Sequence, residues 1–240
     1  PAVAEEAIIA RDVLLAEQVQ SRLHVCHVST AGSVDIIRWA KQRGINVTAE
    51  VTPHHLLLTD ELARGYDASF KVNPPLRRSE DVQALREALA DGTIDIVATD
   101  HAPHPSETKD CEWSAAAFGM VGLESALAVV HTAMVATGMM SWADVERVMV
   151  TAPAQIGLHA EAARPIEQGR QADITLIDPS ASRTWDSSML AGRSTNTPYL
   201  GVTLTSDIRH TIRAGYLTLH DGAVVAADVV AQAAERSRRG

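Results

Sequence analysis

Histidine and aspartate side chains follow three stretches of apolar, β-branched sequence, each near the point where the stretch ends. The stretches are residues 23–28, 46–52 and 94–99, and the side chains in chain order are His27, His54, His55, Asp100, His101 and His104. If the stretches are parallel strands, their carboxyl ends meet on one face, which is the active-site face of a parallel α/β barrel. Imidazole and carboxylate ligands suit a catalytic zinc, which keeps a position for water. The pattern therefore predicts a divalent-metal hydrolase.

The candidates differ in how far their position alone supports a function. Asp100 directly follows apolar strand residues, and burying an isolated carboxylate is costly, so it must be paired or ligated. A single histidine near a strand end, such as His27 or His24, is commonly a hydrogen-bonded structural group, and we interpret His24 in that way. His54 and His55 are adjacent, so at most one of them faces the site. We expect one of these two to orient its neighbours and to bind no metal.

The elements that position these residues alternate along the chain. Helices are expected at 2–20, 33–43 and 79–89, each followed by one of the three strands, and this alternation indicates parallel βα units. Further helices are expected at 122–137, 142–150 and 153–158. Short strands are expected after residue 165, within 172–178 (ADITLID) and 210–225 (HTIRAGYLTLHDGAVV), with a hairpin at His220-Asp221-Gly222. The sequence therefore predicts an α/β fold, with a barrel part at 1–163, a β-rich segment at 164–240, and a frayed tail at 236–240.

Composition restricts the classes of protein to consider. The 240 residues are 46% hydrophobic and 21% charged, which is typical of a globular protein. The net charge of −9 argues against broad nucleic-acid binding, and no apolar run is long enough to span a membrane. Two cysteines, Cys26 and Cys111, form no CxxC motif, which argues against a disulfide scaffold or a Cys-rich zinc site and favours a reducing compartment.

Six short motifs in a fixed order resemble those of dihydroorotases, in the form found in bacteria and in multifunctional complexes. They are 24–30 (HVCHVST), 52–55 (TPHH), 71–77 (KVNPPLR), 98–104 (ATDHAPH) with Lys109 five residues on, Phe118-Gly119, and 196–198 (NTP). Because the matches run from about residue 5 to residue 222, they cover most of the chain.

The resemblance implies a distorted (β/α)8 barrel of the amidohydrolase superfamily with a smaller β domain. It implies reversible conversion of N-carbamoyl-L-aspartate to L-dihydroorotate in pyrimidine biosynthesis, with one or two Zn²⁺ ions per intact active site. By resemblance, His27 after strand six would be a zinc ligand, and Asp100 after strand eight a zinc ligand and the general acid–base. The remaining implied site residues are Asn73 and His104, which would contact substrate, and Phe118 and Gly119, whose backbone groups would close over it.

The chain departs from the family pattern in one respect. The family pattern requires a His-x-His pair from the first strand, an Asp from the fourth and a His from the fifth, yet no His-x-His occurs among the ten histidines of this chain. Only three barrel strands are readable, whereas a barrel has eight, so we expect at least ~150 upstream residues to be missing and Pro1 to be internal. We therefore expect that this chain alone cannot assemble a complete binuclear zinc site and is inactive. Open strand edges and an uncovered core predict that it cannot persist as a soluble monomer without the missing part, a second copy of the chain or a rearrangement.

Two alternatives remain at this stage. One is another cyclic amidohydrolase, such as a dihydropyrimidinase or allantoinase, and the other is a non-catalytic dihydroorotase-like scaffold that partners aspartate transcarbamoylase. The expected partners are a small-molecule substrate and either a second copy or the missing N-terminal part, with aspartate transcarbamoylase as a further candidate. Neither nucleic acid nor membrane is expected as a partner, and the expected location is the cytoplasm.

Overall fold

The computed structural model describes residues 1–232, so the tail expected to fray at 236–240 lies outside the described residues. Three strands, β1 (Leu23–Val25), β2 (Val47–Val51) and β3 (Ile96–Val97), form a parallel sheet in the order β1-β2-β3. Its register pairs Leu23 with Val47 and Glu50 with Ile96. The predicted parallel βα units are therefore present.

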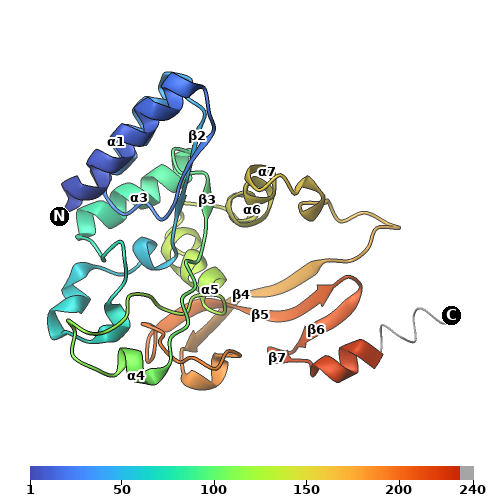
Figure 1. Cartoon of the computed structure of the whole chain (residues 1–240). Coiled ribbons are helices and arrows are strands. Elements are labelled where there is room, and N and C mark those ends of the chain that lie inside the picture. Colours follow the sequence, from blue (N-terminus) through green and yellow to red (C-terminus); the bar gives the residue numbers. More distant parts are fainter. Residues whose placement is uncertain (233–240) are drawn as a thin grey trace.

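Three long helices connect and precede these strands: α1 (Ala2–Val19), α2 (Ala31–Gln42) and α3 (Ser79–Asp91). Figure 1 shows α1 and α3 to one side of β2 and β3, with α6 and α7 on the other side of the view. The shorter helices are α4 (Ser106–Lys109), α5 (Ala126–Val130), α6 (Trp142–Glu146) and α7 (Ala152–Ile156). Turns of 3₁₀ helix lie at His54–Leu56, Asp60–Gly65, Ala68–Phe70, Ala160–Ala162 and Ser187–Met189, and π-helical turns at His131–Val135 and Arg147–Thr151.

The two faces of the parallel sheet differ in chemistry. Val47, Ala49 and Val51 of β2 are buried in one apolar core with side chains from α1, α2, α3 and α6. Since side chains alternate along a strand, Thr48 and Glu50 occupy the opposite face. A parallel sheet with helices over one face and polar residues on the other has the construction of part of a (β/α)8 barrel, as the sequence predicted.

Both outer strands of this sheet, β1 and β3, have one unpaired edge within residues 1–232. The first helix also leaves large apolar side chains at least 48% exposed, namely Val3, Ile8, Leu14, Leu15 and Val19. Exposed apolar surface and open strand edges are features that proteins normally cover. The inability of this chain to persist as a monomer stays a prediction.

The second sheet is antiparallel, in the order β4-β5-β6-β7. Its strands are β4 (Ile174–Thr184), β5 (Thr203–Arg213), β6 (Tyr216–His220) and β7 (Ala223–Val224). The expected hairpin is confirmed, since Asp221 (φ 48°) and Gly222 (φ 75°) form a two-residue turn between β6 and β7. Val129 of α5 shares a second apolar core with Trp185, Tyr199 and Leu204, which ties this sheet to the barrel part. The division at residue 163 stays a prediction. None of the helices within residues 1–232 has the length and apolar character needed to cross a membrane.

Candidate functional site

The two predicted metal ligands both lie where a parallel strand ends. His27 has φ 39° and Asp100 has φ 48°, a left-handed backbone that non-glycine residues adopt infrequently. This backbone turns the chain out of the sheet, so β1 ends at Val25 and β3 at Val97, earlier than the predicted strands. The amide of His27 donates a hydrogen bond to Oε1 of Glu50 at 3.3 Å. The strained conformation thus places both residues at the carboxyl end of the sheet.

Several predicted site residues lie around this end of the sheet. His27 and Asn73 line the same cavity, whose volume is about 600 Å³. Burial raises the pKa of the Cys26 thiol, and the charges of Glu50 and Asp100 raise it further. His27 follows β1 and Asp100 follows β3, and both strands pair in parallel with β2, so both residues lie at the same end of the sheet. The structure brings His27, Asn73 and Asp100 to one region, and their catalytic and ligand roles remain proposals.

The other predicted site residues form a second group, which consists of His104, Phe118 and Gly119. Nε2 of His104 lies 2.8 Å from the carbonyl oxygen of Phe118, so this ring nitrogen donates its proton there. The amide of His104 donates to Oδ1 of Asn196 at 3.2 Å. The Gly119 amide donates to the carbonyl of Lys71 at 2.9 Å. Because this amide is already paired within the chain, a contact between the Gly119 amide and substrate would require that bond to open.

Two buried lysines fix the loop that leads to Phe118 and Gly119. Lys71 Nζ donates to the carbonyls of Trp113 at 2.5 Å and Ala116 at 2.6 Å, and it lies 4.5 Å from the centre of the Phe118 ring. Lys109 Nζ donates to the carbonyl of Gly119 at 2.8 Å. Burial lowers the pKa of Lys109, and the neighbouring charge of Lys71 lowers it further. Charge-assisted bonds of this kind hold the loop in this conformation.

Gly119 is a position where no larger residue fits. Its φ is 122°, and a Cβ placed there would lie 2.5 Å from Cβ of Ala102 and 3.3 Å from Nε2 of His104. We expect Gly119→Ala to lower the free energy of unfolding by at least about 2 kcal/mol, since backbone strain adds to a steric collision. Gly138→Ala is the control, because Gly138 has φ 77° but open space around it. Urea unfolding of both variants measures the difference. Equal losses in the free energy of unfolding would show that the collision at Gly119 adds nothing to the backbone strain.

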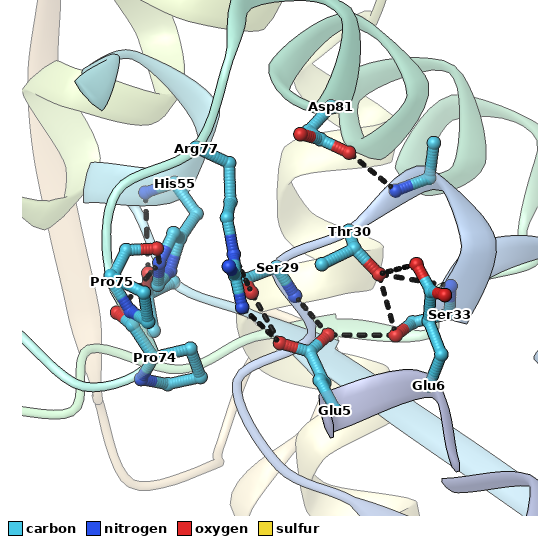
Figure 2. Close-up of polar contacts among 12 residues, drawn as sticks. Glu5, Glu6, Ser29, Thr30, Ser33, His55, Pro74, Pro75, Arg77 and Asp81 are labelled. Carbon is cyan, nitrogen blue, oxygen red and sulfur yellow. Dashed lines mark hydrogen bonds and ion pairs between the residues drawn. The ribbon is translucent and has the colours of Figure 1, made fainter. Parts of the chain in front are cut away.

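His55 and His54 are both buried, and His55 orients the chain after Asn73 (Figure 2). Nε2 of His55 donates to the carbonyls of Pro74 at 3.1 Å and Pro75 at 3.3 Å. Nδ1 accepts from the Thr52 hydroxyl at 2.7 Å, so the neutral ring satisfies both contacts. This agrees with the expectation that one histidine of the pair positions its neighbours. Nε2 of His54 has no hydrogen-bond partner among residues 1–232, and burial keeps the pKa of His54 well below its ordinary value.

The neutral state of His55 predicts a pH dependence of stability. Burial lowers the pKa of His55 from 6.5 to about 4. Between these two values the unfolded chain binds a proton that the folded chain does not. Stability is therefore fully present above pH 6.5 and decreases as the pH falls toward 4, by about 3 kcal/mol. Urea unfolding across this range should show that slope, and it should flatten in His55→Gln; an unchanged slope in the variant would contradict the assignment.

A carboxylate from α1 connects the segment after His27 with the segment after Asn73 (Figure 2). Glu5 accepts a hydrogen bond from the Ser29 amide at 2.9 Å and a short one from the Ser29 hydroxyl. It also accepts from the Ser33 hydroxyl at 2.8 Å and pairs with Nη2 of Arg77 at 3.4 Å. Nε of Arg77 donates to the Ser29 hydroxyl at 2.9 Å, which closes the network. We name the set of Glu5, Ser29, Ser33 and Arg77 the Glu5 network.

None of these positioning residues was predicted to have a role. Arg77 and Lys71 lie in the KVNPPLR motif, and Asn196 lies in the NTP motif, so the motifs themselves carried a signal. Asn196 Nδ2 donates to the carbonyl of Ala102 at 2.9 Å and thereby joins two segments 94 residues apart. Glu5 carried no signal in the sequence, because helix α1 reads as an ordinary helix with an acidic first turn.

The predicted ligands fit zinc in chemistry, although they are two of the several ligands that the family resemblance implies. An imidazole and a carboxylate at the carboxyl ends of parallel strands are the donors that catalytic zinc takes. Within the described residues, the His, Cys, Asp and Glu group compact enough to surround an ion is His24, Cys26 and Glu50, and it includes neither His27 nor Asp100.

Comparison with known sequences decides the family. A profile of the amidohydrolase family matches residues 4–218. The chain belongs to the amidohydrolase family. A dihydroorotase from Leifsonia xyli is 68% identical over 94% of this amidohydrolase chain and 51% of its own length. A dihydroorotase from Mycobacterium tuberculosis is 50% identical over 93% of the chain and 52% of its own length. The resemblance to dihydroorotases is confirmed, and the chain spans about half the length of these curated relatives.

Solved structures agree with this assignment of fold. An L-hydantoinase (dihydropyrimidinase) from Arthrobacter aurescens superposes with a TM-score of 0.87 at 30% identity, and covers 94% of this amidohydrolase and 51% of that chain. A dihydropyrimidinase from Brevibacillus agri gives a TM-score of 0.85 at 25% identity, with 94% and 50% covered. The barrel and the antiparallel sheet together therefore follow an amidohydrolase fold over about half its length.

Proposed function

We propose that this chain supplies half of the active site of a dihydroorotase, which cyclises N-carbamoyl-L-aspartate to L-dihydroorotate and reverses that reaction. The observation that carries the proposal is the sequence identity of 50–68% to dihydroorotases across more than nine-tenths of the chain. The joint placement of His27, Asn73 and Asp100 at one end of the sheet supports it.

Asp100 is the proposed general acid–base. In the cyclisation direction its carboxylate accepts the proton from the attacking ureido nitrogen, and in hydrolysis it returns a proton to the same nitrogen as the ring opens. A zinc ion held by His27, Asp100 and ligands from outside this chain would polarise the reacting carbonyl and acidify a water molecule. Asp100 is exposed at the carboxyl end of the sheet, so its carboxylate is accessible to a substrate.

Asn73 and His104 are the proposed substrate contacts. The exposed amide of Asn73 can donate to a substrate carboxylate from the cavity that it shares with His27. His104 already uses Nε2 to donate to Phe118, so only its Nδ1 is left to face a ligand. A neutral ring with this tautomer accepts at Nδ1, whereas a protonated ring donates there. His104 would therefore contact a substrate through Nδ1.

A cytoplasmic location and assembly into an oligomer complete the proposal, together with aspartate transcarbamoylase as a candidate partner. Both cysteines are free, which suits a reducing compartment. The unpaired edge of β1 and the exposed apolar side chains of α1 provide surface for another chain or another part of the same barrel.

A chimera tests the proposed activity. Residues 1–240 replace the matching half of the Leifsonia xyli relative, so that the barrel is complete. We expect the chimera to hydrolyse L-dihydroorotate, as measured by loss of its ultraviolet absorbance and by the appearance of N-carbamoyl-L-aspartate. A folded chimera with stoichiometric zinc and no turnover of either compound would contradict the proposal.

Hydantoin hydrolysis is the second candidate activity, because the structural neighbours include an L-hydantoinase and a dihydropyrimidinase at 25–30% identity. The same chimera distinguishes the two activities when dihydroorotate and unsubstituted hydantoin or dihydrouracil are compared by kcat/KM. The dihydroorotase proposal predicts a preference for the carboxylated ring, lost in Asn73→Ala. A preference for the uncharged rings would favour the second candidate.

A further inference from the structure

Three potential metal ligands meet on the polar face of the parallel sheet, beside but not within the predicted zinc pair. His24 lies in β1, and Cys26 directly follows the end of this strand. The two residues are two positions apart, so their side chains point to the same face. The register of β1 on β2 pairs Val25 with Ala49, which places Cys26 beside Glu50. One ligand atom from each of these three side chains lies within 4.8 Å of the other two. The strand geometry thus forms a triangle of nitrogen, sulfur and oxygen donors.

Hydrogen bonds already orient two of the three ligands. Nε2 of His24 lies 3.0 Å from Oε2 of Glu50, and Nδ1 lies 2.8 Å from the Thr48 hydroxyl. An ion between His24 and Glu50 would replace the proton that these two groups share. Nδ1 of His24 would then carry the proton and donate it to Thr48, the kind of outer-shell bond that fixes metal-binding histidines.

An entry path for an ion is also present. His24 and Cys26 line the cavity of about 600 Å³ that His27 also lines, and the thiol of Cys26 is exposed. Glu50 is less accessible, with 14% of its side chain exposed, so it forms the floor of the group. A hydrated cation can reach the thiol from the cavity and exchange its water for the imidazole and carboxylate.

We propose that His24, Cys26 and Glu50 form a second metal site, for a thiophilic divalent cation such as Zn²⁺ or Cd²⁺. A thiolate, an imidazole and a carboxylate are three donors that such ions accept in tetrahedral sites, and a fourth position remains for water. Because Glu50 also accepts a hydrogen bond from the His27 amide, an ion here would compete for a carboxylate that positions the predicted zinc ligand. Formation of this site does not depend on the proposed dihydroorotase activity, because all three ligands lie within the chain.

Cadmium titration of the 240-residue chain tests the site without any assay of activity. The charge-transfer absorption of a cadmium–thiolate bond is followed in the ultraviolet, with a phosphine reductant so that no added thiol competes. We expect one equivalent of Cd²⁺ to produce the band in the wild type and in Cys111→Ser, the matched control at the other exposed cysteine. Cys26→Ser should lose the band. His24→Asn and Glu50→Gln should bind Cd²⁺ at least about tenfold more weakly.

The following results distinguish a metal site at His24, Cys26 and Glu50 from other binding. A band that survives in Cys26→Ser, or an affinity unchanged in both His24→Asn and Glu50→Gln, would overturn the proposal. A loss of affinity in His27→Ala with none in His24→Asn would assign the ion to the predicted catalytic pair instead. X-ray absorption of the cadmium-loaded wild type needs no variant: one sulfur and one imidazole in the first shell support the site, and a shell without either overturns it.

Discussion

Replacing Asp100 by Asn in the chimera should lower kcat/KM for dihydroorotate by about a thousandfold. The amide keeps the shape of the carboxylate but cannot accept the proton of the ureido nitrogen, and proton transfer by a positioned group contributes about 10²–10⁴-fold. It also weakens the proposed zinc ligand, which adds to the loss. Steady-state kinetics in both reaction directions, with zinc content measured on the same samples, provide the test.

The control for this variant is Asp110→Asn, which changes an exposed carboxylate in the loop before Phe118. That change should leave kcat/KM within about twofold, since a surface substitution outside the site has little effect. With zinc removed from both proteins, the Asp100 variant should unfold at the same urea concentration as the unsubstituted chimera because Asp100 is exposed. A less than tenfold loss of kcat/KM in Asp100→Asn would remove Asp100 from the mechanism.

Breaking the Glu5 network should have the largest effect on stability. Glu5 and Arg77 are each 13% exposed at the side chain, and removing one member of such a pair leaves a buried charge without its partner. We expect Glu5→Gln to lower the free energy of unfolding by about 3 kcal/mol. Glu61→Gln is the matched control, because the Glu61–Arg64 pair is exposed and its loss leaves no buried charge. Equal effects of the two substitutions would contradict the account.

The same carboxylate should make the chain sensitive to acid. Burial raises the pKa of Glu5, but hydrogen bonds from Ser29 and Ser33 and the charge of Arg77 outweigh burial and lower it below 4.5. The contribution of Glu5 to the free energy of unfolding is therefore present above pH 4.5. It is lost as the pH falls through the lowered pKa of Glu5 in the folded chain. In Glu5→Gln that part of the acid transition should be absent.

The sequence predicted the order of the elements better than their ends. The alternation of helices and strands through residue 100 is confirmed, because apolar periodicity reports which face of each element is buried. The strands are shorter than predicted since His27 and Asp100 adopt left-handed backbone, which residue type does not indicate. The first half of β5 was missed because its polar residues Thr203, Thr205 and Asp207 give no apolar pattern.

For the candidate site, the sequence indicated the residues but not the contacts that orient them. Residue types and positions after strands were enough to single out His27 and Asp100, and the motifs added Asn73, His104, Phe118 and Gly119. The contacts that orient them join distant segments, as Asn196 does for the segment from Ala102 to His104. Such contacts depend on how the elements pack, so spacing along the chain could not reveal them.

The central claim is that this chain holds half of a dihydroorotase site and requires the other half of the barrel. Mixing tests it most directly: the 240-residue chain is combined with the separately produced half of the Leifsonia xyli relative that it does not match, and dihydroorotate turnover is measured in the presence of zinc. The account predicts no turnover by either half alone and turnover by the mixture, abolished by Asp100→Asn. Full turnover by this chain alone, or an unchanged rate with Asp100→Asn in the mixture, would contradict it.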